Sequence, residues 1–99
     1  MTRQQIENHA AMIDSALTDC GLPHTKTTYQ RVLAGEKRGE HFFGARSFKS
    51  EISLDDVWLY LCDTLPDVAE ISIYPLWAPA FDDRFANDFA RYCIEIRFE

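Results

Sequence analysis

The sequence predicts an α+β protein in which two helices pack on one face of a four-stranded antiparallel sheet. Apolar residues recur at spacings of three and four in two segments, 3–20 and 54–64, and each segment begins at a capping residue. Two extended segments follow each helix, and the last of them, 91–98, alternates strictly between apolar and polar residues. The predicted order is therefore α-β-β-α-β-β, for which two layers are the simplest arrangement.

The first predicted helix begins at Thr2, and Gln5 three residues later completes a capping box. Gly21 suits the left-handed position after a helix, and Pro23 prevents the helix from continuing. The apolar face of this helix consists of Ile6, Ala10, Ile13, Leu17 and Cys20.

Two strands, 25–33 and 41–48, are predicted on either side of a polar turn bounded by Gly35 and Gly39. Gly44 interrupts the alternation of the second strand, which indicates a bulge or a close approach of the backbone.

The second predicted helix is capped by Ser53, and Asp55 and Asp56 complement the helix dipole in its first turn. Its apolar face consists of Leu54, Val57, Trp58, Leu61 and Leu65. A strand over 68–76 follows, and residues 91–98 form the last strand, with one face in the core and the other toward solvent. The sequence does not determine the order of the strands in the sheet.

A chain of 99 residues with 46% hydrophobic residues is predicted to be one domain, 1–99, with its own core. The three cysteines lie far apart in predicted helices or strands, so we expect buried free thiols in a reducing, cytoplasmic environment. These cysteines are Cys20, Cys62 and Cys93. The N-terminus is too polar for a signal peptide, and no apolar run has the length of a membrane span.

The chain carries no catalytic signature. His9, His24 and His41 lack the spacing of metal ligands, and neither a phosphate-binding glycine loop nor a nucleophile elbow is present. We therefore expect a protein that is not an enzyme and uses no cofactor or metal. A small enzyme or ligand-binding domain is an alternative, which a pocket between helix and sheet holding His41 with Arg46 or an aspartate would favour.

The first candidate binding surface is the aromatic segment 77–89, which joins the last two strands. Trp, Tyr and Arg are over-represented among residues that dominate binding energy. The partner-binding candidates are Tyr74, Trp77, Phe81, Asp82, Asp83, Arg84 and Phe85. Alternatively, the phenylalanines fold back over the sheet and extend the core.

The second candidate is the basic hairpin 26–49. Residues 25–50 carry six basic residues against two glutamates, although the whole chain has a net charge of −6. The side chains that would contact phosphates are Arg31, Lys37, Arg38 and Arg46. The alternative is a solvated hairpin whose basic residues discourage pairing at the edge of the sheet.

The third candidate is the acidic half of the chain, where residues 51–99 carry eleven carboxylates against three arginines. Such a surface would meet a basic groove on a protein partner. In size and charge the chain resembles the small inhibitors and immunity proteins of phages and mobile elements, anti-CRISPR and anti-restriction proteins included. The leading hypothesis is a binding protein that occludes a protein partner. The first alternative is a nucleic-acid-binding module that uses the basic hairpin. A homodimer through an open sheet edge is compatible with these two hypotheses and with the small enzyme or ligand-binding domain.

Overall fold

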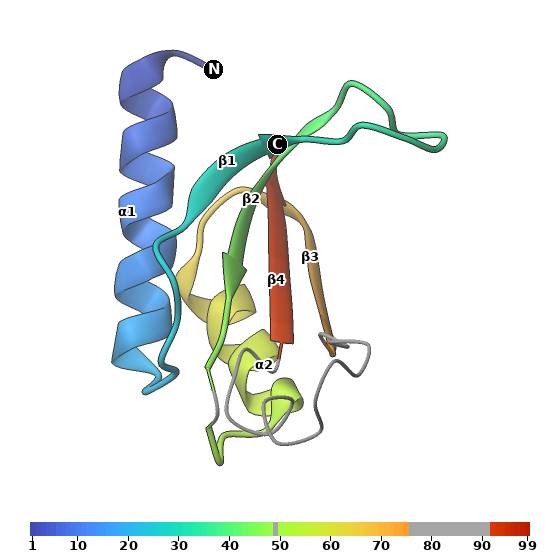
Figure 1. Ribbon diagram of the computed structural model, residues 1–99. Helices are drawn as coiled ribbons and strands as arrows, with labels where there is room; N and C mark the ends of the chain where they lie inside the picture. Colours follow the sequence, from blue (N-terminus) through green and yellow to red (C-terminus); the bar gives the residue numbers. More distant parts are fainter. Residues whose placement is uncertain (49, 76–91) are drawn as a thin grey trace.

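The computed structural model describes residues 1–48, 50–75 and 92–99 and confirms the predicted α+β fold (Figure 1). Two helices contact a four-stranded antiparallel sheet. The elements are α1 (Arg3–Asp19), β1 (Thr28–Arg31), β2 (His41–Arg46), α2 (Leu54–Thr64), β3 (Val68–Pro75) and β4 (Tyr92–Phe98).

The strands lie in the order β1-β2-β4-β3, and every neighbouring pair is antiparallel. The chain therefore forms two hairpins, whose second strands, β2 and β4, pair at the centre of the sheet. Each hairpin follows one helix. An approximate twofold axis between β2 and β4 therefore relates the strand order of the two helix-hairpin units. The long edge of the sheet is β3, and the short edge is β1.

The strands alternate between a face covered by the helices and a second face. Ile94 and Ile96 of β4 are fully buried on the helix side, opposite Ala45 and Phe43 of β2. Residues of the opposite parity, such as Glu95, form the second face of the sheet, which we call the open face because neither helix covers it (Figure 1). The buried core consists of Ile13, Ala16, Leu17, Leu22, Phe43, Ala45, Val57, Leu61, Leu65, Ile94 and Ile96.

Both helices begin as the sequence predicts. The Thr2 side chain accepts a hydrogen bond from the Gln5 backbone, and the Gln5 side chain accepts one from the Thr2 backbone. Ser53 accepts a hydrogen bond from the Asp56 backbone and caps α2. Gly21 follows α1 with a φ of +83°, the left-handed conformation that glycine adopts without strain.

The first strand begins later than predicted, because Thr27 bonds to a helix instead of to a strand. Its backbone N–H and its hydroxyl both donate to Asp14 Oδ1 of α1, at 2.9 and 2.6 Å. Thr27 is almost fully buried, so the Asp14 carboxylate accepts hydrogen bonds from two donors that would otherwise be unpaired in the core. His24 Nε2 lies 3.4 Å from the same oxygen.

The bulge predicted at Gly44 is not observed, and pairing is regular through this residue on both sides. The crowding there comes from side chains, because a Cβ atom would lie 3.0 Å from Gln30 Nε2 and 3.3 Å from the Phe42 ring. The irregular register lies instead between Val68 and Glu70, near the start of β3.

The prediction that all three cysteines are buried is wrong for Cys62, which is exposed on the outer side of α2. Cys20 and Cys93 are half-buried, and all three thiols are free. Within the described residues, no helix is both long enough and apolar enough to cross a bilayer.

Candidate functional site

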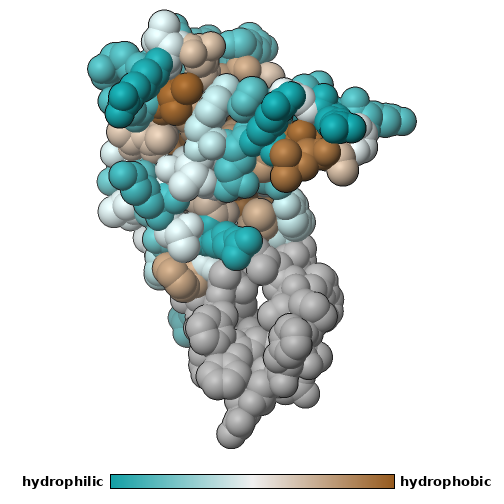
Figure 2. Space-filling model, turned by 45° about the horizontal axis from the view of Figure 1, so that its top comes forward, coloured by the Kyte–Doolittle hydropathy of each residue, from teal (hydrophilic) through white to brown (hydrophobic). Residues whose placement is uncertain are grey.

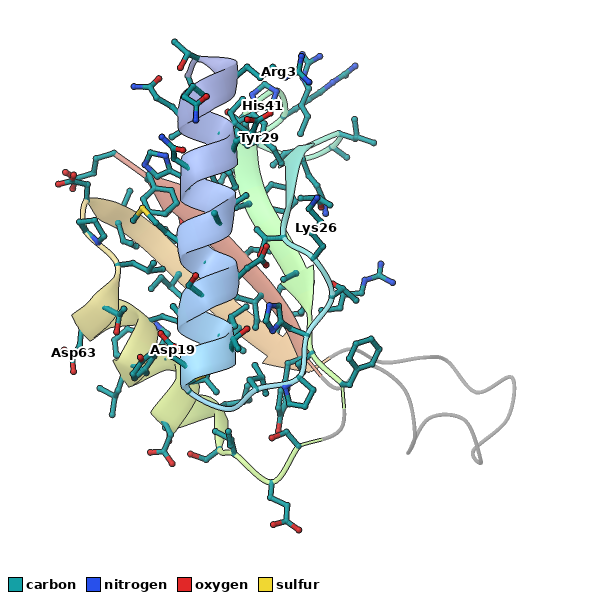
Figure 3. All side chains as sticks on the ribbon, turned by 90° about the vertical axis from the view of Figure 1, so that its left-hand side faces the viewer. Arg3, Asp19, Lys26, Tyr29, His41 and Asp63 are labelled. Carbon is teal, nitrogen blue, oxygen red and sulfur yellow. The ribbon has the colours of Figure 1, made fainter. Side chains whose placement is uncertain are left out.

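Two of the three histidines, His9 and His41, stack on aromatic rings, and the third, His24, lies beside Asp14. His9 stacks edge-on against Phe98, with ring centroids 4.3 Å apart, and His41 lies parallel to Tyr29 at 4.9 Å. Figure 3 shows Tyr29 and His41 together near the N-terminal end of α1. His41 and Arg46 occupy opposite ends of β2, so the pocket that would favour a small enzyme is not formed by this pair.

Of the predicted partner-binding residues, the structure describes Tyr74. This residue exposes 43% of its surface on the open face, and its hydroxyl donates a 2.6 Å hydrogen bond to Glu95 Oε1. The neighbouring Cys93 thiol, opposite in register, and then the Glu95 carboxylate raise the pKa of Tyr74. The other candidates lie outside the described residues: Trp77, Phe81, Asp82, Asp83, Arg84 and Phe85.

The four predicted phosphate-contacting residues do not converge on one surface. Arg31 ends β1 with the parity of the helix side, whereas Arg46 ends β2 with the parity of the open face. Lys37 and Arg38 lie on the connection between β1 and β2, about one strand length from Arg46. Lys37 Nζ lies 3.2 Å from Glu70 Oε2, so its charge is already paired within the fold.

The connection between β1 and β2, residues 32–40, forms an arm that projects beyond the sheet (Figure 1). Val32 and Glu40 extend the hairpin, because the Val32 N–H donates to the Glu40 carbonyl at 2.8 Å. Gly39 adopts a φ of +94° and returns a hydrogen bond of 2.9 Å to the Val32 carbonyl. Figure 2 shows hydrophobic surface on this arm beside hydrophilic surface, and Leu33 of the arm is 80% exposed.

Ion pairs connect the arm to the far side of the sheet. Arg97 of β4 pairs with Glu40 of the arm and with Glu70 of β3, and Lys37 pairs with the same Glu70. The hydrogen bond from Lys37, and then the charge of Arg97, hold the pKa of Glu70 below its usual range. Three segments that are distant in sequence therefore meet at one carboxylate.

A hollow of about 390 Å³ lies between the arm and the open face. Val32 and Ala34 of the arm and Phe42 of β2 supply apolar surface, and Ser72 of β3 supplies a hydroxyl. Its charged lining residues are Glu36, Lys37, Glu70, Glu95 and Arg97. Its volume lies within the range of small-ligand pockets.

A second hollow, of about 300 Å³, continues along the open face and shares Phe42 and Glu95 with the first. Lys26 and Arg46 line it, together with the hydroxyl of Thr28. The open face is thus more acidic near the arm and more basic near the start of the first hairpin.

The outer face of α2 is the surface that the sequence interpretation missed. Trp58 is 45% exposed and Leu59 is 53% exposed, although spacing grouped Trp58 with the apolar face of this helix. The buried side of α2 is centred on Val57 and Leu61, and Trp58 is one residue, or 100°, beyond Val57. In the sequence, only Leu59 indicates apolar surface on the outer side of α2, because its position does not fit the helical spacing of the core residues.

The charged residues of α2 are all acidic: Asp55, Asp56 and Asp63, each of them exposed. Figure 3 shows Asp63 and Asp19 toward the same side of the molecule and Lys26 on the other side of α1. A shallow groove of about 340 Å³ between the helices is lined by Met12, Asp19 and Leu65, among others. We call the exposed residues Asp55, Asp56, Trp58, Leu59, Cys62 and Asp63 the α2 face.

The described residues bring together no group of three or more His, Cys, Asp or Glu side chains placed to hold a metal ion. The chain matches no family model, no curated protein and no solved structure with which it was compared.

Proposed function

We propose that this protein is a non-enzymatic binding module that occludes a protein partner, and that the α2 face is the described part of its interface. The observation that carries this proposal is the exposure of Trp58 and Leu59 on a helix whose charged residues are all carboxylates. The partner would present an apolar pocket within a basic surface.

The apolar part of the argument rests on the cost of exposing large side chains. Trp58 and Leu59 are adjacent in sequence and both remain about half exposed in the folded chain. Tryptophan is enriched among residues whose truncation costs a complex more than about 2 kcal/mol, because its large ring is desolvated on binding. A partner that covers both side chains would gain this energy without any change in the fold.

The electrostatic part of the argument concerns orientation and association rate. Asp55, Asp56 and Asp63 are exposed on the same helix as the apolar pair, and Asp19 adds an exposed carboxylate at the end of α1. Complementary charges speed association and exclude partners of the wrong sign more than they add affinity. An acidic module of this kind would compete for a protein surface that otherwise binds phosphate groups, as an inhibitor of a phage or mobile element would.

The remaining parts of this proposal extend the same reasoning. Free cysteines fit a cytoplasmic location, where thiols stay reduced. Occlusion needs no catalytic group, which fits the stacking of His9 and His41 on aromatic rings. The aromatic segment 77–89 is a second proposed contact, and it lies outside the described residues.

The experiment is quantitative affinity capture from cells of the source organism, with the wild-type chain and two variants on parallel resins. Trp58→Ala and Leu59→Ser should each lose the same captured protein. Leu33→Ser is the matched control, because Leu33 is more exposed than either residue but lies on the arm. Purified partner should then bind Trp58→Ala at least roughly 30-fold more weakly than wild type, which is the effect of a hot-spot residue.

Circular dichroism of each variant must match the wild type, because Trp58 and Leu59 are surface residues. A partner retained by Trp58→Ala and Leu59→Ser, but lost with Leu33→Ser, would move the interface to the arm and contradict the proposal for α2. Asp55→Asn with Asp56→Asn should slow association and flatten its salt dependence while leaving dissociation nearly unchanged.

The alternative is a nucleic-acid-binding module, and the observation in its favour is the second hollow, which Lys26 and Arg46 line together with Phe42. It predicts saturable binding of labelled single-stranded DNA or RNA that weakens steeply with salt. Fluorescence anisotropy over a salt series tests it, with Arg46→Ala as the variant and Arg31→Ala as the control on the other face. Absence of binding at low salt would exclude the nucleic-acid-binding alternative and favour the protein-binding proposal.

A further inference from the structure

The hollow between the arm and the open face has chemistry that the α2 face does not share. It is lined by the arm and three strands, with Ala34 from the arm, Phe42 from β2, Ser72 from β3 and Glu95 from β4 among its lining residues. The set of residues that lines the hollow therefore depends on tertiary structure. The hollow persists only while the arm stays against the sheet. The ion pairs of Lys37 with Glu70 and of Glu40 with Arg97 hold the arm in that position.

The positively charged side chains that line the hollow already form ion pairs with carboxylates of the protein. Lys37 pairs with Glu70, and Arg97 pairs with both Glu70 and Glu40. An anion entering the hollow would have to displace a carboxylate from one of these bases. An isolated phosphate or carboxylate ligand is therefore poorly matched to this site.

Two carboxylates of the hollow have no cationic partner among the described residues. Glu36 lies on the arm and makes none of the recorded ion pairs, and Glu95 accepts only the neutral hydroxyl of Tyr74 through its Oε1. The uncompensated charge of the lining is thus negative. A positive ligand group would find two carboxylates without a cationic partner in the lining, one from the arm and one from the sheet.

The apolar part of the lining complements a hydrocarbon body. Phe42 is half-buried and borders both hollows of the open face, and Val32 and Ala34 line the first hollow from the arm. The face of an aromatic ring attracts cations as well as apolar groups. Lys37 illustrates the same chemistry within the fold, because its alkylammonium group lies against the carboxylate of Glu70.

We propose that this hollow is a binding site for an organic cation, namely an ammonium group on a short apolar or aromatic stem. Glu36 and Glu95 hold the ammonium group, and Phe42 with Val32 holds the stem. The proposal is independent of the α2 face, so either can fail without the other. Small amines and the lysine side chain of a peptide share this chemistry, and the experiment separates them.

The experiment is a titration of the isotope-labelled full chain, followed by backbone amide shifts in NMR. 2-Phenylethylammonium should give saturable shifts in residues 32–37, 42 and 95. Uncharged 2-phenylethanol and anionic phenylacetate have the same ring and should bind at least roughly tenfold more weakly. Each of them loses both the ion pair and the cation–π contact that the ammonium group makes. Equal or tighter binding of phenylacetate would overturn the proposal.

The variants Glu36→Gln and Glu95→Gln remove one negative charge each and should each weaken 2-phenylethylammonium by roughly three- to tenfold. Glu51→Gln is the matched control, because this exposed glutamate lies outside the hollow. Phe42→Leu keeps an apolar side chain and should still weaken the aromatic amine. Unchanged affinity in Glu36→Gln and Glu95→Gln together would refute the assignment.

Two further probes identify the source of the cation. Butylammonium represents a free amine, and lysine blocked at both backbone ends represents a peptide side chain. Tighter binding of the blocked lysine would assign the site to a basic segment of a polypeptide, and tighter binding of butylammonium would assign it to a small amine. Absence of saturable shifts with all three cations would show that the hollow is not a cation site.

Discussion

Lys37 on the arm lies 3.2 Å from the Glu70 carboxylate on β3, at the edge of the sheet opposite the strand that leads into the arm. Arg97 joins the same carboxylate from β4, so one side chain links three segments. The arm is also held to the sheet by its own hairpin hydrogen bonds and by the ion pair of Glu40 with Arg97. Its position, and with it the hollow, thus depends in part on the ionisation of Glu70.

The first prediction concerns the acid limit of this link. Because Lys37 and Arg97 lower the pKa of Glu70, the stability they contribute is present above the ordinary pKa of a glutamate, about 4. It is lost as the pH falls through the lowered value. Carbon-detected NMR titration should find the pKa of Glu70 lower in the wild type than in Lys37→Met.

Lys26→Met is the control for this titration, because it removes the same charge from a residue on the other side of the open face. It should leave the titration of Glu70 unchanged. Hydrogen exchange of residues 33–38 should increase in Lys37→Met alone, because the arm then loses one of its contacts with the sheet. Identical Glu70 titrations in the wild type and in Lys37→Met would contradict the described ion pair.

The second prediction concerns the opposite end of the pH scale. Cys93 and Glu95 raise the pKa of Tyr74, so the protonated hydroxyl stabilises the fold below the ordinary tyrosine pKa of about 10. This stability is lost as the pH rises through the higher folded value. Ultraviolet titration should show one of the four tyrosines ionising later than the others, and Tyr74→Phe should remove that late component.

Glu95→Gln should bring the late ionisation toward its ordinary range, because the amide carries no negative charge beside the phenolate. Glu99→Gln, on the last residue of the chain, is the control and should leave it in place. Simultaneous ionisation of all tyrosines in the folded wild type would show that Tyr74 lacks this environment.

The third prediction concerns the tie between α1 and the segment before β1. Asp14→Ala removes the acceptor of both Thr27 donors and leaves them in a nearly closed site. The free energy of unfolding should fall by about 2–3 kcal/mol, as for the loss of hydrogen bonds to a charged group. Asp19→Ala removes an exposed carboxylate from the same helix and should change it by no more than about 0.5 kcal/mol.

Urea unfolding of both variants measures the difference, provided that the slope of the transition stays constant. Thr27→Val should give a smaller loss than Asp14→Ala, because it keeps the backbone N–H bond to the carboxylate. Equal stability of Asp14→Ala and Asp19→Ala would mean that water replaces the carboxylate at Thr27.

The fold was predictable because helical caps and strand alternation are local signals. Thr2 with Gln5 marks the start of α1, and the alternating residues 92–98 mark β4 as half-buried. Each signal needs only neighbouring residues, and the α-β-β-α-β-β order then restricts the layers to a few arrangements. The strand order β1-β2-β4-β3 carries no such local signal, because it depends on which strands meet after the chain collapses.

The candidate sites were less predictable for the same reason. The ion pair between Lys37 and Glu70 joins residues 33 positions apart, so no spacing in the sequence identifies it. The basic residues of the hairpin led to the prediction of a phosphate-binding surface. One of them, Lys37, instead forms an ion pair with Glu70 within the fold. Trp58 lies at the boundary of the buried side of α2, where a difference of one helical position decides between core and surface.

The last prediction uses Cys62, which lies one helical turn from Trp58 on the α2 face. Cys62 is exposed, whereas Cys20 is half-buried and donates from its thiol to the Leu17 carbonyl at 3.3 Å. Burial raises the pKa of the Cys20 thiol, which lowers its reactive thiolate fraction at neutral pH. A disulfide reagent should therefore modify Cys62 first, roughly tenfold faster than Cys20.

Cys62→Ser should abolish the fast phase of this reaction, and Cys20→Ser should preserve it. A fast phase that persists in Cys62→Ser would place a different thiol at the surface. The same reaction reports on the proposed interface, because a partner bound over Trp58 would shield the neighbouring Cys62 and slow its modification. A partner that binds without protecting Cys62 would have to dock elsewhere, and the α2 face would then lose its assigned role.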